Sequence, residues 1–162
     1  MNRKLLALAV TAALAAPLTA QAAPTVYGLL NLSVDMVDLE STGDDEWQVN
    51  SNSSRLGVKG EEALGNGYSA VYKAEWGVSG DGDAADLSQR DRYLGLKGNW
   101  GTVKLGNYDS PLKTSQGSVD QFNDMTYLDM ASVGIRGDNR LRNSIGYESP
   151  KIAESVTVKV TL

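Results

Sequence analysis

Apolar and polar residues alternate with a period of two in short segments along most of this chain, and glycine-containing turns separate many of the segments. A strand presents successive side chains to opposite faces, so the pattern predicts sheet with one apolar and one polar face. After residue 22 no apolar run approaches the 18 residues that a spanning helix needs. The expected fold is therefore a soluble exported β or α/β domain, or a β-barrel whose membrane face is hidden in the alternation.

Seven segments are expected to be strands. The first starts at Val26 and alternates to Met36, and the second ends at about Glu61. The other five cover 68–76, 90–98, 102–108, 140–147 and 155–162. In the fourth segment the facing is ambiguous, because Leu94 and Leu96 share parity with Arg90 and Arg92. The acidic stretch from Val37 to Gln48 has too little apolar content to pack, so a surface loop is expected there.

The third segment carries the clearest signal, with Tyr68, Tyr72 and Trp76 on one face. Trp76 lies eight positions after Tyr68, which corresponds to roughly 20 Å along the normal of a membrane crossed by a tilted strand. That spacing suits two aromatic girdles around an apolar band. The hydroxyl of Tyr72 would then lie at mid-depth, where it needs a polar partner or a neighbouring subunit in place of lipid.

Residues 1–22 have the basic start, the apolar run and the Ala-Gln-Ala end of a secretory signal peptide. Cleavage after Ala22 leaves residues 23–162, and this part carries 13 basic and 20 acidic residues. An exported chain with this acidic excess is not expected to bind nucleic acid.

Missing residue types restrict the chemistry further. The chain has no cysteine and no histidine, which excludes Ser-His-Asp and Cys-His catalysis, disulfides and His- or Cys-ligated zinc. The run from Asp81 to Asp86 has Asp86 where a calcium loop requires glycine. No metal site, cofactor or catalytic residue is predicted.

The strand rhythm stops from Asp109 to Asn139. These 31 residues show no sustained alternation, and a loop of that length is usually functional or disordered. Alternation resumes at Arg140.

Three tracts resemble the Gram-negative general porin family. They are the tract from Ser54 to Gly67, the tract from Tyr93 to Gly106, and the tract from Arg140 to Pro150, and Val26-Tyr27-Gly28 matches the family's opening. The resemblance covers essentially the whole of residues 23–162. It implies an all-β antiparallel transmembrane barrel of 16 strands, trimeric in the Gram-negative outer membrane, through which small hydrophilic solutes and ions diffuse. Outer-membrane lipid and lipopolysaccharide are then expected to surround it.

The resemblance also implies where the channel narrows. In the family the third external loop folds into the lumen, and here that loop corresponds to 109–139. Basic residues of the wall face acidic residues of this loop. By motif position the pore-lining residues are Arg55, Lys59, Arg90, Arg140 and Arg142 on the wall and Asp120, Asp124 and Asp129 on the loop. Guanidinium groups opposite carboxylates would set up a transverse field that orients dipolar solutes.

Seven strands cannot close a 16-stranded barrel, and the chain ends at Leu162 in mid-pattern. The expectation is therefore an N-terminal part of a porin. Two other classes stay open at this point: a small eight-stranded outer-membrane barrel with a structural or adhesive role, and a soluble exported enzyme or β-sandwich binding protein.

Overall fold

The computed structural model describes residues 23–39, 44–82, 87–117, 119–125, 128–130, 134 and 136–162. The expected signal peptide therefore lies outside the described residues. The described elements are β1 (Thr25–Leu29), β2 (Leu32–Leu39), β3 (Asp44–Ser51), β4 (Arg55–Gly65), β5 (Tyr68–Val78), β6 (Leu87–Gly98), β7 (Gly101–Asp109), α2 (Pro111–Gln116), β8 (Arg140–Glu148) and β9 (Lys159–Thr161).

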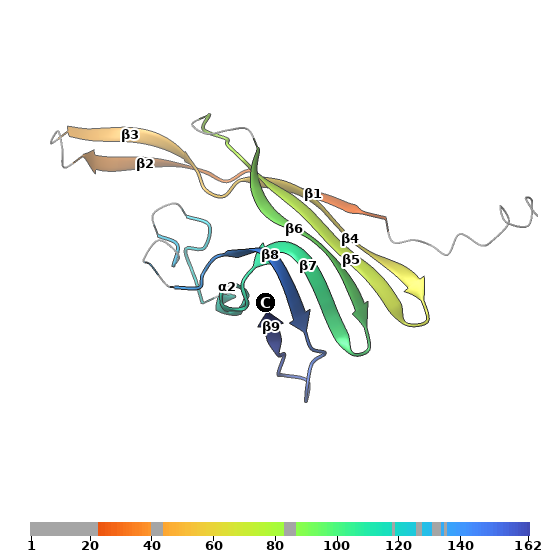
Figure 1. Cartoon of the computed structure of the whole chain (residues 1–162). Coiled ribbons are helices and arrows are strands. Elements are labelled where there is room, and N and C mark those ends of the chain that lie inside the picture. The colour runs from red at the N-terminus through yellow and green to blue at the C-terminus, as the bar shows by residue number, and fades with distance from the viewer. Residues whose placement is uncertain are drawn as a thin grey trace, which may run out of the picture.

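Within the described residues the main sheet has seven strands in the order β1-β4-β5-β6-β7-β8-β9, and every neighbouring pair is antiparallel. The sheet is curved and open, with β1 and β9 at its edges (Figure 1). The predicted all-β antiparallel fold is confirmed. No helix among the described residues has the length and apolarity to cross a membrane.

Strands β2 and β3 form a separate hairpin that extends the β1–β4 pair beyond the sheet (Figure 1). The loop expected from Val37 to Gln48 is therefore wrong over most of its length: β2 runs to Leu39 and β3 starts at Asp44. Apolar cross-strand pairs, Val34 with Val49 and Met36 with Trp47, explain why the strands continue into this acidic stretch.

The last predicted strand is also shorter than expected. A turn closed by the bridge between Ile152 and Val156 precedes β9, so the strand covers only Lys159–Thr161, and Leu162 continues the pairing with β8 through two backbone hydrogen bonds with Ile145.

One face of the main sheet, here called the outer face, is apolar and uncovered. Its large side chains are 41 to 60% exposed, namely Leu56, Leu94, Leu96, Leu105 and Ile145. In the described part of the chain, Tyr108 is the only large apolar residue that is buried. A soluble sheet would cover such a face with a second layer. This chain presents the face as a surface, which is what a membrane strand requires.

Two β-bulges explain the ambiguous parity of the arginines. Ala74 pairs with Arg92 and Trp76 pairs with Gln89, so Arg90 and Asp91 together oppose Glu75. Arg90 thereby shares the face of Glu75, whereas the guanidinium carbon of Arg92 lies 5.2 Å from the ring centroid of Trp76. The extra residue shifts the phase of the strand by one, as a bulge does.

The second bulge lies where Arg142 and Asn143 together oppose Asn107, between the pairs Tyr108–Leu141 and Gly106–Ser144. Asn143 has a φ of 51°, in the left-handed region that Asn tolerates. As a result, the shared parity of Arg140 and Arg142 does not place these two side chains in the same surroundings.

Candidate functional site

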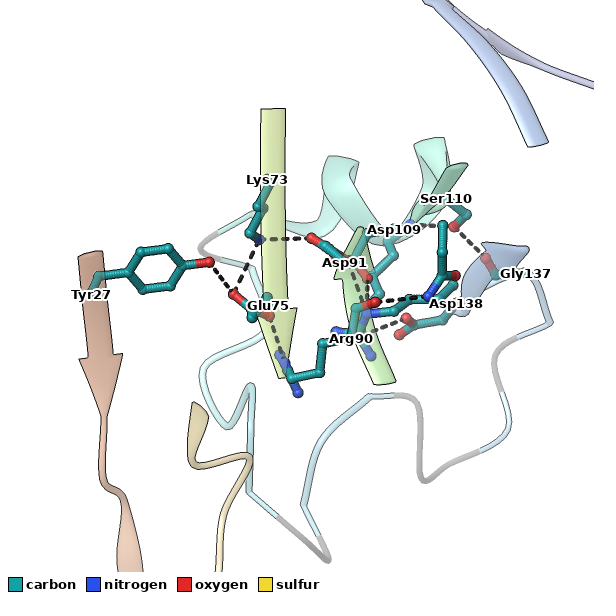
Figure 2. A network of polar contacts seen from close by, with 12 residues as sticks. Tyr27, Lys73, Glu75, Arg90, Asp91, Asp109, Ser110, Gly137 and Asp138 are labelled. Atoms are coloured by element: carbon teal, nitrogen blue, oxygen red, sulfur yellow. Dashed lines mark hydrogen bonds and ion pairs between the residues drawn. The ribbon is translucent and has the colours of Figure 1, made fainter. Parts of the chain in front are cut away.

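The face opposite the leucines, here called the inner face, carries a network of ion pairs near the end of the strands from which the segment 109–139 departs (Figure 2). Glu75 of β5 is its first centre, and its side chain is 4% exposed. Its carboxylate accepts hydrogen bonds from Tyr27 Oη at 2.7 Å and Arg90 Nε at 2.6 Å, and Lys73 Nζ lies 3.2 Å away. These donors come from β1, β5 and β6, so the network joins strands across the sheet.

Asp91 of β6 is the second centre. It accepts hydrogen bonds from Lys73 Nζ at 2.7 Å and from Arg140 Nε at 2.9 Å. Arg140 Nε also lies 3.2 Å from Asp109 Oδ1. Lys73 therefore bridges the two carboxylates, and Arg140 connects the wall to the strand end where the long segment begins.

The two ends of the segment 109–139 are fastened together beside this network. Ser110 caps α2 by accepting a hydrogen bond from Lys113 N, and its hydroxyl donates to Gly137 O at 2.6 Å. Ser110 N also donates to Asn139 O at 2.9 Å.

Asp138 completes this fastening. Its carboxylate accepts hydrogen bonds from Lys113 Nζ and Gln116 Nε2, both at 2.8 Å. Burial alone would raise the pKa of Asp138, but these two hydrogen bonds outweigh it and hold the pKa below its usual value.

Within the segment, three aspartates have different roles. Asp120 accepts hydrogen bonds from Phe122 N and Met130 N, and Asp129 accepts one from Asp124 N. These two carboxylates therefore shape the segment itself. Asp124 instead reaches the wall, where Arg55 Nη1 donates to it at 2.6 Å.

The Arg55–Asp124 pair brings the segment across the inner face. Between the segment and the inner face lies a hollow of about 150 Å³. All of its lining residues are charged or polar, namely Arg55, Lys73, Glu75, Arg90, Asp109, Lys113, Asn123, Asp124 and Arg140. Such a surface orients water and charged solutes rather than burying an apolar ligand.

The structure brings together four of the eight residues predicted from sequence to line a pore: Arg55, Arg90, Arg140 and Asp124. It does not bring in the others. Lys59 lies over the ring of Tyr27, Arg142 is exposed beyond the bulge, and Asp120 and Asp129 bond within the segment.

Sequence reasoning missed Lys73, Glu75, Asp91, Asp109 and Lys113. Lys73 and Glu75 share the polar parity of their strand, which was a usable signal for facing. Asp91 has the opposite parity to Arg90, and only the bulge puts both on the inner face. Among the described residues, no group of three or more acidic side chains could hold a metal ion.

Aromatic residues mark both ends of the outer face. Tyr68 is 43% exposed beside the β4–β5 turn, and Trp76 lies eight residues further along β5. Trp100 and Tyr147 stack at the turn end with ring centroids 6.4 Å apart, which sequence reasoning did not single out. The hydroxyl of Tyr72 finds a protein partner, Glu62 Oε1, at 3.1 Å.

Comparison with known protein families gives a match to the family model for Gram-negative porins over residues 7–162. The major outer membrane protein P.IB of Neisseria gonorrhoeae is 31% identical over 164 residues, which cover 94% of this chain and 46% of that protein. Outer membrane porin protein 32 of Delftia acidovorans is 32% identical over 163 residues, or 93% of this chain and 46% of that protein. The chain thus spans about half the length of the curated relatives it matches.

Solved structures give the same fold. The anion-selective porin from Comamonas acidovorans superposes with a TM-score of 0.67 at 28% identity, covering 82% of this chain and 44% of that one. A loop-deletion mutant of OmpT, an outer membrane protein of Vibrio cholerae, superposes with a TM-score of 0.64 at 22% identity, covering 87% and 43%.

Proposed function

This chain belongs to the Gram-negative porin family, and we propose that residues 23–162 form part of the wall of an outer-membrane channel for passive diffusion of small hydrophilic solutes and ions. The outer face would contact acyl chains, and the inner face would line the water column. Residues 1–22 would be the signal peptide that directs export. The proposal includes no catalysed reaction and no cofactor.

The observation that carries this proposal is the Arg55–Asp124 contact. It ties a residue of the long segment to the wall 69 positions earlier, at the place where the other wall cations gather. In a barrel, a segment held over the inner face narrows the lumen. We therefore propose that 109–139 is the constriction loop and that its carboxylates face the wall arginines.

Four further pore residues are proposed that do not meet at the Arg55–Asp124 contact: Lys59, Arg142, Asp120 and Asp129. Lys59 lies on the inner face away from the narrowest point, and Arg142 lies beyond the bulge. Asp120 and Asp129 would act through the shape of the loop. Tyr68 and Trp76 would anchor the outer face at the two lipid boundaries.

The partners of the channel follow from the same picture. The apolar outer face suits lipid, and acidic lipopolysaccharide would surround the external end. A homotrimer of the complete barrel is the proposed assembly. Within the chain, Glu62 already gives the hydroxyl of Tyr72 the polar partner that it needs on the outer face.

The two other classes considered from sequence are not favoured. A soluble β-sandwich needs a buried apolar core, and the described residues bury one large apolar side chain. A small eight-stranded barrel has an interior filled by side chains, which leaves no room for the segment that Arg55 holds over the inner face.

A planar-bilayer recording tests the proposal. The membrane-inserted protein that contains this chain should produce stepwise increases in conductance, and liposomes carrying it should swell faster in small sugars than in large ones. Protein that is correctly inserted in the membrane, yet passes neither ions nor sugars, would contradict the channel.

A further inference from the structure

Two lysines of the inner face lie on tyrosine rings. Lys59 Nζ is 5.4 Å from the ring centroid of Tyr27. Lys104 Nζ is 4.2 Å from the centroid of Tyr108 and 5.4 Å from that of Tyr93. These separations are in the range of cation–π interactions.

Glycines create the space in which two of these rings lie against the wall. A Cβ atom at Gly57 would lie 2.7 Å from Cζ of Tyr27, and a Cβ at Gly146 would lie 2.5 Å from the hydroxyl of Tyr108. Both glycines therefore permit a ring to cover the backbone. The same combination of glycine, covering tyrosine and lysine occurs twice, as Gly57–Tyr27–Lys59 and as Gly146–Tyr108–Lys104.

These lysines differ from the other lysines of the wall in their charge balance. Lys73 pairs with Glu75 and Asp91, Lys97 pairs with Glu61 at 2.9 Å, and Lys159 lies 3.7 Å from Glu148; these pairs hold most of the wall's ammonium groups close to carboxylates. Among the residues that the structure describes, neither Lys59 nor Lys104 has a carboxylate oxygen within 4.0 Å. A ring face attracts an ammonium group but does not cancel its charge.

The register places Lys59 level with Lys73, the member of the ion-pair network nearest the short turns, and places Lys104 one row beyond it on the turn side. Lys59 is directly opposite Lys73, which is directly opposite Tyr93, so the three share one row across the inner face. Lys104 is opposite Gly95, one row nearer the β6–β7 turn. Glu75 lies one row away in the other direction, toward the long segment. A solute that leaves the network toward the short turns would therefore pass Lys59 and then meet Lys104.

We infer that the two ring-supported lysines, Lys59 on β4 and Lys104 on β7, provide two separate weak sites that together form a binding station for small inorganic anions, distinct from the constriction and on its short-turn side. The inference rests on the proposed channel function. Each ring fixes an ammonium group near the wall without neutralising it, so the positive potential stays available to an ion in the water column. Weak, repeated sites of this kind favour entry of an ion while still allowing release.

The test uses potassium chloride as the probe and the membrane-inserted protein that contains this chain. Reversal potentials in a salt gradient give the ratio of chloride to potassium permeability. The double variant Lys59→Gln with Lys104→Gln should lower this ratio about two- to tenfold, since two cationic charges leave the wall. Its conductance should also rise more linearly with salt concentration, because a saturable site has been removed.

Two matched variants separate charge position from general effects. Lys59→Arg with Lys104→Arg keeps both charges and should keep the ratio. Lys97→Gln with Glu61→Gln removes a neutral pair from the same wall and should also leave the ratio unchanged. If the Lys59/Lys104 double glutamine variant conducts with an unaltered ratio, the anion station is wrong while the channel stands. If the unmodified protein does not conduct, the proposed channel itself fails.

Discussion

Single glycines on the inner face decide where tyrosine rings can lie. A Cβ at Gly57 would press on Tyr27 and would also lie 2.9 Å from Ala74 O, whereas a Cβ at Gly28 would meet only Arg55 O at 3.5 Å. Moving the Tyr27 side chain would not relieve the contact with the backbone oxygen of Ala74. The position therefore requires glycine for space, although its φ is ordinary.

Gly57→Ala should for this reason destabilise the inserted protein by about 1–3 kcal/mol, the usual cost of overpacking. The matched control is Gly28→Ala, in the neighbouring strand, which should change stability by less than about 0.5 kcal/mol. Urea unfolding from lipid, followed by tryptophan fluorescence, measures both. Equal effects of the two variants would show that Tyr27 does not occupy the space above Gly57.

The carboxylate of Asp138 makes the base of the long segment sensitive to acid. Its pKa is lowered in the folded state, so its contribution to stability is fully present above the unfolded value of about 3.9 and is lost as the pH falls through the lowered folded value. Cleavage by pepsin within residues 109–139 should therefore accelerate below about pH 3.9.

Asp138→Asn provides the comparison for that experiment. It removes the charge that faces Lys113 at neutral pH, so tryptic cleavage after Lys113 should already be faster there than in the unmodified protein. Identical cleavage rates in the two proteins would mean that Asp138 does not hold the segment.

At the scale of elements, the alternation predicts the strands and their faces, and it fails where a bulge intervenes. Each of the seven strands of the sheet overlaps one of the segments expected from the sequence, with ends that differ by a few residues. The phase of β6 and β8 could not be predicted, because the residues that form a bulge do not differ visibly from their neighbours. Arg90 and Arg92 look equivalent in the sequence, yet one joins Glu75 and the other covers Trp76.

The parity of a residue also does not indicate its depth in the channel, that is, how far along the strand it lies. Lys59 and Arg55 share a face of β4, but only Arg55 is level with the loop. The contacts of Asp124, Asp120 and Asp129 depend on how an irregular segment folds, for which no periodic signal exists. Resemblance to the family pointed to the segment and to Arg55, Arg90 and Arg140, which the structure brings together. The register was needed to find Lys73, Glu75 and Asp91.

The two faces of the strands predict opposite responses to a new charge. Leu94 is 60% exposed and lies in the row of Tyr72 and Leu105, midway between the aromatic ends. Leu94→Arg should cost about 2–4 kcal/mol in lipid, the range for a cation at the midplane. Leu56→Arg should cost less, because Leu56 is paired with Trp76 near the lipid boundary.

Ser69→Arg is the control for that experiment, since Ser69 lies opposite Lys97 on the inner face. It should change stability little, because water reaches that face of the sheet. A large loss of stability with Ser69→Arg and none with Leu94→Arg would reverse the assignment of the faces.

For the whole molecule, the proposed channel requires that the open sheet be part of the wall of a barrel. The charged network, the fastened loop base and the ring-supported lysines all lie on one face, and the uncovered leucines lie on the other. The edge strands β1 and β9 expose unpaired backbone groups among the described residues, which cannot face hydrocarbon. In the proposed channel wall, further strands would have to pair with these edges; the curated relatives that the chain matches are about twice as long as the chain.

Fluorophores attached at single introduced cysteines test the two faces most directly, and the chain offers a background without cysteine. In the membrane-inserted protein, labels at Ser69 and Lys97 should be quenched by aqueous iodide, and labels at the adjacent positions Ala70 and Leu96 should be quenched by nitroxide-bearing lipid. Quenching that does not alternate between these neighbouring pairs, or iodide quenching at all four positions, would contradict a channel wall.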